Sequence, residues 1–206
     1  MKFQTKQEFF WKGKFGDQYF KRNKSKDLLI SYQKFFNKAL NKANKINSII
    51  EFGPNIGMNL VVLKKILKPK KITAVEINKI NCIKLKKITN VEVINNSILN
   101  FVSKELYDLV VLRGLLIHIN PKKLNQAYRA IYNSCKKDKY ILFAEYYNPY
   151  PIKIDYRGNK NVLFKRDFAG EFMNKFKKTK LVDYGFVYHR DKYPLDDITW
   201  FLLQKK

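Results

Sequence analysis

The chain is poor in the residue types that build disulfides and metal sites. Two of its 206 residues are cysteine and two are histidine, so neither a disulfide framework nor a metal site is indicated. We expect Cys82 and Cys135 to be buried, reduced thiols, and both fall in segments that we predict to be helical. The chain also has no apolar run near the ~18 residues of a bilayer-spanning helix and starts without a signal core. These absences favour a cytoplasmic protein without membrane contact.

Arginine is scarce although the formal net charge is +25. Only six of the 42 basic residues are arginine, and the abundant lysine accompanies much Asn, Ile, Phe and Tyr, as an AT-rich coding sequence would produce. Arginine reports phosphate recognition better than lysine because its guanidinium forms bidentate hydrogen bonds. Nucleic acid is therefore a possible partner but not the favoured one.

Length and composition fit a single domain. A chain of 206 residues that is 46% hydrophobic can bury one α/β core but not two comfortable ones. From Ile46 onward, strand and helix patterns alternate, which is typical of βαβ units. We predict a domain over residues 46–206 and a helical lid or extension over residues 1–45, with a helix at Asp27–Leu40.

The alternating pattern predicts a Rossmann-like α/β fold. Its mostly parallel seven-stranded central sheet would have helices on both faces and an antiparallel strand near the C-terminus. Residues 146–170 lack a sustained period and are expected to form an excursion that holds substrate. Strands are expected at Ser48–Phe52, Lys71–Glu76, Val91–Ile94, Tyr107–Leu112, Lys139–Glu145, Lys180–His189 and Ile198–Gln204, and helices at Gly57–Leu67, Ile77–Ile88, Pro121–Lys137 and Arg166–Phe176.

A glycine turn follows the first predicted strand. Gly53 and Gly57 permit positive φ and close backbone approach, and Asn55 tolerates the left-handed region better than most residues. With a strand before and a helix after, this turn suits a backbone that passes beneath an adenosyl cofactor. Glu76 ends the next strand and would accept hydrogen bonds from ribose hydroxyls. The alternative for Glu76 is an exposed carboxylate at a helix start.

The residues around the turn favour S-adenosylmethionine over a nicotinamide. The Gly-x-Gly-x-x-Gly of nicotinamide enzymes is absent, and Glu51 suits the methionine end of the cofactor, directly or through water. Asn96 and Ser97 follow the third strand, where the adenine would lie. Arg113 follows the fourth strand and would lie beside the sulfonium, at the carboxyl ends of the strands.

Several stretches resemble a known family. They run from Phe15 to Asn23, Glu51 to Asn59, Gly114 to Pro121, Ala144 to Pro149, Asp155 to Gly158, Phe164 to Glu171 and Val182 to Asp191. On these stretches the chain resembles the class I S-adenosylmethionine-dependent methyltransferases, and more narrowly a bacterial set known as pseudaminic acid biosynthesis-associated methylases. The resemblance implies methyl transfer with S-adenosylhomocysteine as product. It also implies a small anionic acceptor, a nonulosonic-type sugar or its nucleotide conjugate.

The N-terminal region contributes candidate cofactor contacts. Tyr19, Arg22 and Asn23 look like the lid of such enzymes, and Arg22 could meet the cofactor carboxylate through a guanidinium fork. The alternative is a surface helix with scattered basic residues. Trp11 is expected to pack in the core or lid.

Two further groups are candidates for chemistry and substrate binding. A base, where one is needed, would come from His118, Glu145, Tyr146 or Asp167, with a packed loop histidine as the alternative for His118. Arg157, Lys165 and Arg166 would bind an anionic acceptor, with a solvated basic loop as the alternative.

Two other functions stay open at this stage. An RNA or protein methyltransferase would use the lysine-rich surface, and a non-catalytic module would bind S-adenosylmethionine without transferring its methyl group. The sequence does not indicate an oligomeric state.

Overall fold

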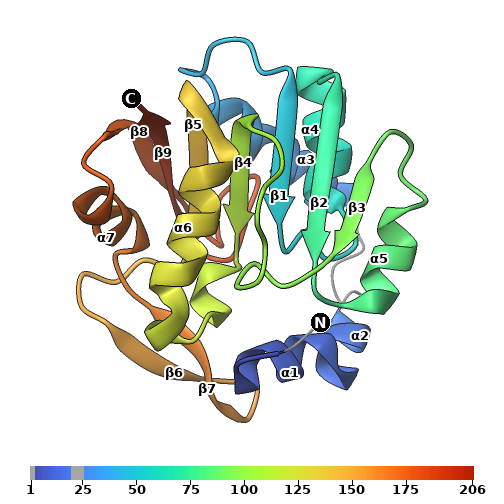
Figure 1. Ribbon diagram of the computed structural model, residues 1–206, viewed down its shortest axis with the longest axis vertical. Helices are drawn as coiled ribbons and strands as arrows, with labels where there is room; N and C mark the ends of the chain where they lie inside the picture. The colour runs from blue at the N-terminus through green and yellow to red at the C-terminus, as the bar shows by residue number, and fades with distance from the viewer. Residues whose placement is uncertain (1–2, 20–25) are drawn as a thin grey trace.

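A seven-stranded sheet organises the computed structural model, which describes residues 3–19 and 26–206. The strand order is β3-β2-β1-β4-β5-β9-β8 (Figure 1), and only β9 runs against its neighbours. This confirms the predicted sheet and its antiparallel C-terminal strand. The strands are β1 (Ser48–Phe52), β2 (Lys71–Glu76), β3 (Glu92–Asn95), β4 (Tyr107–Arg113), β5 (Cys135–Glu145), β8 (Thr179–Val187) and β9 (Ile198–Lys205).

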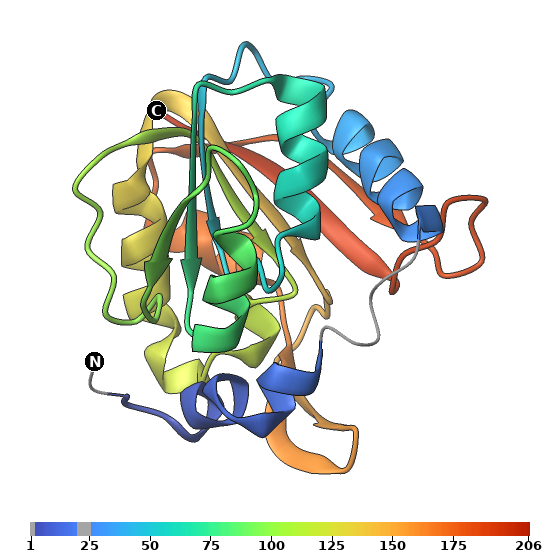
Figure 2. The same ribbon diagram turned by 90° about the vertical axis from the view of Figure 1, so that its right-hand side faces the viewer.

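Helices cover both faces of the sheet, as predicted. On one face lie α3 (Lys26–Ala39) and α4 (Met58–Leu67), and on the other α6 (Leu124–Ser134) and α7 (Phe168–Lys175), as Figure 2 shows for α3, α4 and α6. Strand β4 divides its side chains between the two cores. Leu109 and Val111 join the α3 and α4 side, whereas Val110 and Leu112 join the α6 and α7 side. This alternation explains why the strand reads as one continuous apolar run.

The N-terminal helices lie at the carboxyl ends of the parallel strands. Helices α1 (Lys6–Lys12) and α2 (Lys14–Tyr19) lie below these ends in both ribbon views (Figures 1 and 2). Helix α5 (Lys79–Leu85) packs against β2, where Leu85 contacts the cluster that contains Ile72 and Ala74. Ligand sites of open α/β sheets form at this end of the strands, so α1 and α2 are placed to cover one.

The excursion after β5 contains regular structure that the sequence did not reveal. Strands β6 (Ile152–Tyr156) and β7 (Asn159–Lys165) form an antiparallel hairpin. At its turn, Arg157 and Gly158 have φ of 50° and 76°, the positive values that two-residue hairpin turns require. The prediction of an irregular loop was wrong here. Strand β6 does alternate apolar and polar residues, but it has only five residues and is mostly exposed, so the pattern is too short to stand out among the Tyr, Pro, Asn and basic residues around it.

Two predicted helices have other bounds than expected. Helix α6 stops at Ser134, preceded by a short 3-10 turn at Pro121–Lys123, and Cys135 begins β5. Cys135 therefore lies in a strand, paired with Tyr107 of β4, and not in a helix. Helix α5 starts only at Lys79 because the Asn78 side chain accepts the Asn81 amide and caps it. Both cysteines are free and buried, as predicted. Within the described ranges, no helix is long and apolar enough to cross a bilayer.

We predict that Asp108 holds the start of β1 against β4. Its buried carboxylate accepts the Asn47 and Ser48 amides at 2.7 and 3.2 Å and pairs with the Lys136 ammonium at 2.9 Å. Burial opposes ionisation, but the Lys136 and Asn47 hydrogen bonds keep the pKa of Asp108 below its ordinary value. Asp108→Asn should therefore lower the free energy of unfolding by roughly 1–3 kcal/mol at pH 7, as measured by urea denaturation.

The lowered pKa of Asp108 also predicts how its contribution to the free energy of unfolding changes with pH. Because the folded-state pKa is lowered, the stabilisation is present above the unfolded pKa and disappears as pH falls through the folded value. The difference between wild type and Asp108→Asn should thus shrink in acid. Asp183→Asn, which breaks the more exposed pair with Lys42, is the matched control and should cost less than about 1 kcal/mol. Equal losses in the two variants would contradict the assignment.

Candidate active site

The glycine turn after β1 adopts the conformation expected of it. Gly53, Asn55 and Gly57 have φ of 69°, 54° and 84°, so asparagine does occupy the left-handed region at the position between the glycines. Gly53 and Asn55 line a pocket at the carboxyl ends of the strands, and Gly57 caps the start of α4. The turn thus has the backbone conformation that the sequence predicts, and it lies at the pocket.

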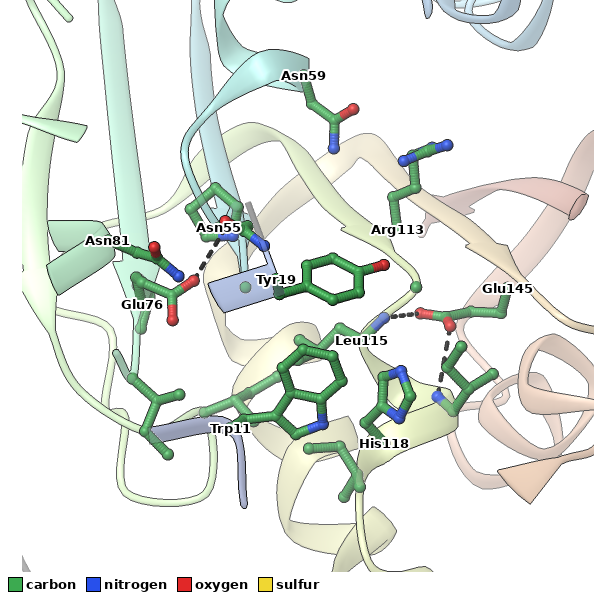
Figure 3. A pocket seen from close by; sticks show the side chains of 18 of the residues that line it. Trp11, Tyr19, Asn55, Asn59, Glu76, Asn81, Arg113, Leu115, His118 and Glu145 are labelled. Carbon is green, nitrogen blue, oxygen red and sulfur yellow. Dashed lines mark hydrogen bonds between the residues drawn. The ribbon is translucent and has the colours of Figure 1, made fainter. Parts of the chain in front are cut away.

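Glu76 connects this turn to the next one. Its Oε2 accepts the Asn55 amide at 2.9 Å, and its Oε1 accepts the Asn78 amide at 2.8 Å (Figure 3 shows the first). The side chain lines the pocket and its residue is only 5% exposed, so the alternative of an exposed carboxylate is wrong. Burial raises the pKa of Glu76 to about 7 against these two hydrogen bonds.

Glu51 lies beneath the pocket floor instead of on it. Its Oε1 accepts the Asn59 side-chain amide at 2.6 Å, and Asn59 lines the pocket. Its Oε2 is buried without a partner among the described residues. Burial raises the pKa of Glu51 to about 7, opposed by the Asn59 hydrogen bond and by the charge of Arg113. Glu51 therefore orients Asn59 and places a carboxylate below the expected methionine end.

Arg113 supplies the cationic side of the same floor. Its Nη1 donates to the Tyr32 hydroxyl at 3.1 Å, and its guanidinium carbon lies 4.2 Å from the Tyr32 ring centroid. Its Nε is buried without a partner among the described residues. Arg113 lines the pocket at the end of β4, as predicted.

The expected adenine side is formed by the turn after β3. Asn96, Ser97 and Ile98 all line the pocket. The Asn96 Oδ1 accepts the Ser97 amide at 2.9 Å, and the Ser97 Oγ accepts the Leu99 amide at 3.2 Å. The side-chain oxygens of Asn96 and Ser97 therefore each accept one hydrogen bond from within their own turn.

His118 stands in an aromatic wall of the pocket. Its Nδ1 lies 2.7 Å from the Val162 carbonyl oxygen of β7, so Nδ1 carries the proton and Nε2 is left as an acceptor. The Trp11 and Tyr156 rings lie 4.5 and 5.2 Å from its centroid. Burial lowers the pKa of His118 to about 4, which keeps the imidazole neutral at pH 7.

Glu145 and Tyr146 also line the pocket. The Glu145 carboxylate accepts the backbone amides of residues 115, 116 and 117 at 3.0, 2.9 and 3.4 Å (two are drawn in Figure 3). Burial raises the pKa of Glu145 to about 7. The geometry gives Glu145 a positioning role, because it holds the backbone that carries His118. Burial raises the pKa of Tyr146 above its ordinary value, so its hydroxyl is neutral at pH 7.

The structure separates Asp167 and Arg166 from the pocket. Asp167 caps α7 by accepting the Gly170 amide at 2.8 Å, so its prediction as a base is wrong. Arg166 donates to Glu171 through Nε and pairs with it through Nη2, both at 2.6 Å. Its guanidinium is committed to fixing α7 and does not reach the pocket lining.

Arg157 and Lys165 lie next to lining residues and not in the lining itself. The Arg157 guanidinium carbon is 5.6 Å from the Tyr156 ring, and the Lys165 ammonium is 5.1 Å from the Tyr146 ring. Tyr19 lines the pocket from α2. Arg22 and Asn23 fall outside the described residues, and their predicted roles stay predictions.

Sequence reasoning missed part of the lining. Trp11 was expected to pack in the core or lid, yet it lines the pocket. Tyr32, Asn59 and Asn81 line it from three different helices. A local signal existed only for Asn59, which lies on the first turn of the helix that the glycine turn starts.

The residues present fit a polar nucleoside ligand. Among the described residues, several lining side chains have a buried polar atom without a hydrogen-bond partner, which costs free energy unless a ligand supplies one. These atoms are Glu8 Oε1, Trp11 Nε1, Asn55 Oδ1, Asn59 Oδ1, Asn81 Oδ1 and Arg113 Nε. Together with Glu76 and the glycine turn, these atoms form a pocket that suits the adenosyl cofactor of a transferase with a Rossmann-like fold.

Comparisons agree with this class. The chain belongs to the methyltransferase-domain family, whose profile matches residues 24–200. It is therefore an S-adenosylmethionine-dependent methyltransferase, which confirms the predicted class and cofactor. No curated protein matches the chain significantly.

Solved structures of methyltransferases share the fold. The 1,6-didemethyltoxoflavin-N1-methyltransferase of Burkholderia thailandensis, with bound 1,6-didemethyltoxoflavin and S-adenosylhomocysteine, has a TM-score of 0.72 at 11% identity, covering 100% of this chain and 92% of that one. The N-methyltransferase NodS of Bradyrhizobium japonicum WM9, in complex with S-adenosylhomocysteine, has a TM-score of 0.65 at 12% identity, with 92% of each chain covered. At such identities the likeness concerns the fold.

We predict that Glu76→Ala weakens S-adenosylhomocysteine binding by at least about tenfold, because a buried carboxylate that accepts ribose hydroxyls forms charge-assisted hydrogen bonds. Titration calorimetry measures the change. Glu92→Ala, on the exposed neighbouring strand β3, is the control and should leave affinity unaltered. If both variants bind like wild type, Glu76 does not contact the cofactor.

We also predict that the ligand-free protein loses stability between about pH 4.5 and 7. Glu51, Glu76 and Glu145 have folded-state pKa values raised from 4.5 to about 7. The folded state therefore binds more protons than the unfolded state in this window, and stability falls as pH rises through it. Urea denaturation at pH 5 and pH 7.5 measures the effect, and Glu145→Gln should flatten it. Stability that increases over this range would show that the three carboxyls ionise normally.

Proposed function

We propose that the protein transfers the methyl group of S-adenosylmethionine to a small anionic acceptor, of the nonulosonic sugar type or its nucleotide conjugate. The observation that carries the proposal is one continuous pocket with two kinds of wall. The glycine turn and Glu76 form its cofactor side. Trp11, Tyr19 and Tyr156 form an aromatic side.

The aromatic side comes from segments that lie over the ends of the strands. Trp11 and Tyr19 belong to α1 and α2, and Tyr156 ends β6. Both segments lie below the strand ends in Figures 1 and 2. A pocket enclosed in this way supports a small acceptor, because a folded RNA or protein would need an open approach to the transferred methyl group.

Two cations support an acceptor with negative charge. Arg157 and Lys165 flank the lining residues Tyr156 and Tyr146. Arg157 is on the hairpin turn and Lys165 ends β7. An acceptor that enters beside either ring would bring its carboxylate or phosphate toward the cation next to that ring.

The chemistry asks little of the protein beyond binding and orientation. When bound, the cofactor supplies a methyl group on a sulfonium, which is already activated. Asn59 and Arg113 would hold the methionine end, and Trp11 would help exclude water. The neutral His118 would accept a hydrogen bond at Nε2 from the hydroxyl or amine of the acceptor and so orient its lone pair. As the acceptor oxygen or nitrogen bonds to the methyl carbon, the electron pair of the C–S bond would stay on the departing thioether sulfur, and the proton released by the acceptor would pass to Nε2. Glu145 keeps His118 in place through the backbone of residues 115–117.

Methyl transfer from labelled cofactor to purified nonulosonic sugars and their nucleotide conjugates tests the proposal. Arg157→Gln combined with Lys165→Gln should raise the acceptor KM by roughly tenfold or more through the loss of two charge contacts, with S-adenosylhomocysteine affinity unchanged. Lys160→Gln, exposed on the same hairpin, is the control and should have little effect. An unchanged acceptor KM in the double variant, or transfer only to neutral acceptors, would show that the acceptor is not recognised as an anion.

A further inference from the structure

The N-terminal helix α1 carries a buried carboxylate in the cofactor pocket. Glu8 lines the pocket and is only 4% exposed. Its Oε2 accepts the Gln4 and Thr5 amides at 2.7 and 2.9 Å, while the Thr5 Oγ1 accepts the Glu8 amide at 3.2 Å. This reciprocal pair is a capping box. It uses one carboxylate oxygen and leaves the other, Oε1, without a partner in the described part of the chain.

Hydrogen bonds at both ends of α1 locate Glu8 within the pocket. One turn before Glu8, the Gln4 side chain donates to Asn100 at 2.7 Å, just past the Asn96–Ile98 turn. One turn after it, the Trp11 and Lys12 carbonyl oxygens accept from Asn78 at 3.2 and 3.1 Å, just past Glu76. Glu8 therefore lies between the expected adenine side and the expected ribose side.

The turn after β3 has no wholly unpartnered acceptor among its side chains. Asn96 Oδ1 and Ser97 Oγ each already accept one backbone amide of their own turn. The exocyclic amino group of adenine is a donor, and it needs an acceptor when it is buried. Asn81 Oδ1 is also without a partner among the described residues. In Figure 3, however, Asn81 lies beside Glu76, on the expected ribose side.

We infer that Glu8 Oε1 accepts the hydrogen bond of the adenine amino group and makes α1 part of the nucleobase recognition site. This inference rests on S-adenosylmethionine as cofactor and is independent of the acceptor. It assigns the lid a role in choosing the nucleobase, because a carboxylate attracts an amino group and repels a carbonyl oxygen at the same ring position.

The test compares S-adenosylhomocysteine with S-inosylhomocysteine, in which a carbonyl oxygen replaces the amino group. Wild type should bind the adenosyl ligand at least about tenfold more tightly, as a hydrogen bond to a buried charged group implies. In Glu8→Gln the capping box is retained, since glutamine serves at this position, and the new amide can donate to the carbonyl. The ratio of the two affinities should fall to about one or invert, as measured by titration calorimetry.

Two matched variants separate recognition from general damage. Thr5→Ala removes the cap but keeps Glu8, and Asn81→Ala removes another unpartnered acceptor of the pocket. Both should leave the ratio near its wild-type value even where each affinity falls. Retention of the full preference by Glu8→Gln, its loss in Asn81→Ala, or equal binding of both ligands by wild type would overturn the inference. If wild type binds neither ligand, the cofactor assignment itself fails, and this role of Glu8 with it.

Discussion

Two backbone amides from different turns converge on one buried carboxylate, and the cofactor pocket depends on that convergence. Glu76 holds Asn55 of the glycine turn after β1 and Asn78 of the turn after β2. Parallel strands bring their carboxyl ends together, but nothing in strand pairing fixes the conformation of the loops that follow. Here the Glu76 side chain fixes both loops through these two hydrogen bonds. Asn78 in turn donates to the Trp11 and Lys12 carbonyls, so the same connection reaches the helix that covers the pocket.

Buried carboxyl groups do the equivalent work elsewhere in the site. The Glu145 carboxylate accepts three consecutive backbone amides just before His118, and the Glu51 carboxyl group accepts the Asn59 side-chain amide. Each group is buried at a cost in desolvation, which its amide hydrogen bonds only partly offset. The site is thus built from backbone loops held by acidic side chains. Its cationic groups are Arg113 in the lining and Arg157 and Lys165 beside the lining. This division suits a cofactor that carries positive charge on sulfur and nitrogen, and it is compatible with the anionic acceptor that we propose.

The parts of the site that the sequence predicts are those encoded locally. Gly53, Asn55 and Gly57 follow a strand and precede a helix, so their turn can be inferred from adjacent residues, and Glu76 follows from the end of the next strand. Glu8, Tyr32 and Tyr156 could not be placed, because only tertiary packing brings α1, α3 and the hairpin to the pocket. Asp167 and Arg166 show the opposite error. Their residue types suggested chemistry, whereas a helix cap and an ion pair with Glu171 account for them.

Helix α1 touches both halves of the pocket at once. Glu8 and Trp11 line it, while the Gln7 side chain bonds to the Asn161 carbonyl oxygen on the hairpin and accepts from Asn120. A ligand beneath α1 and a ligand beside the hairpin would therefore be covered by one helix. Any displacement of α1 that opened the way to the hairpin side would therefore uncover the cofactor side as well.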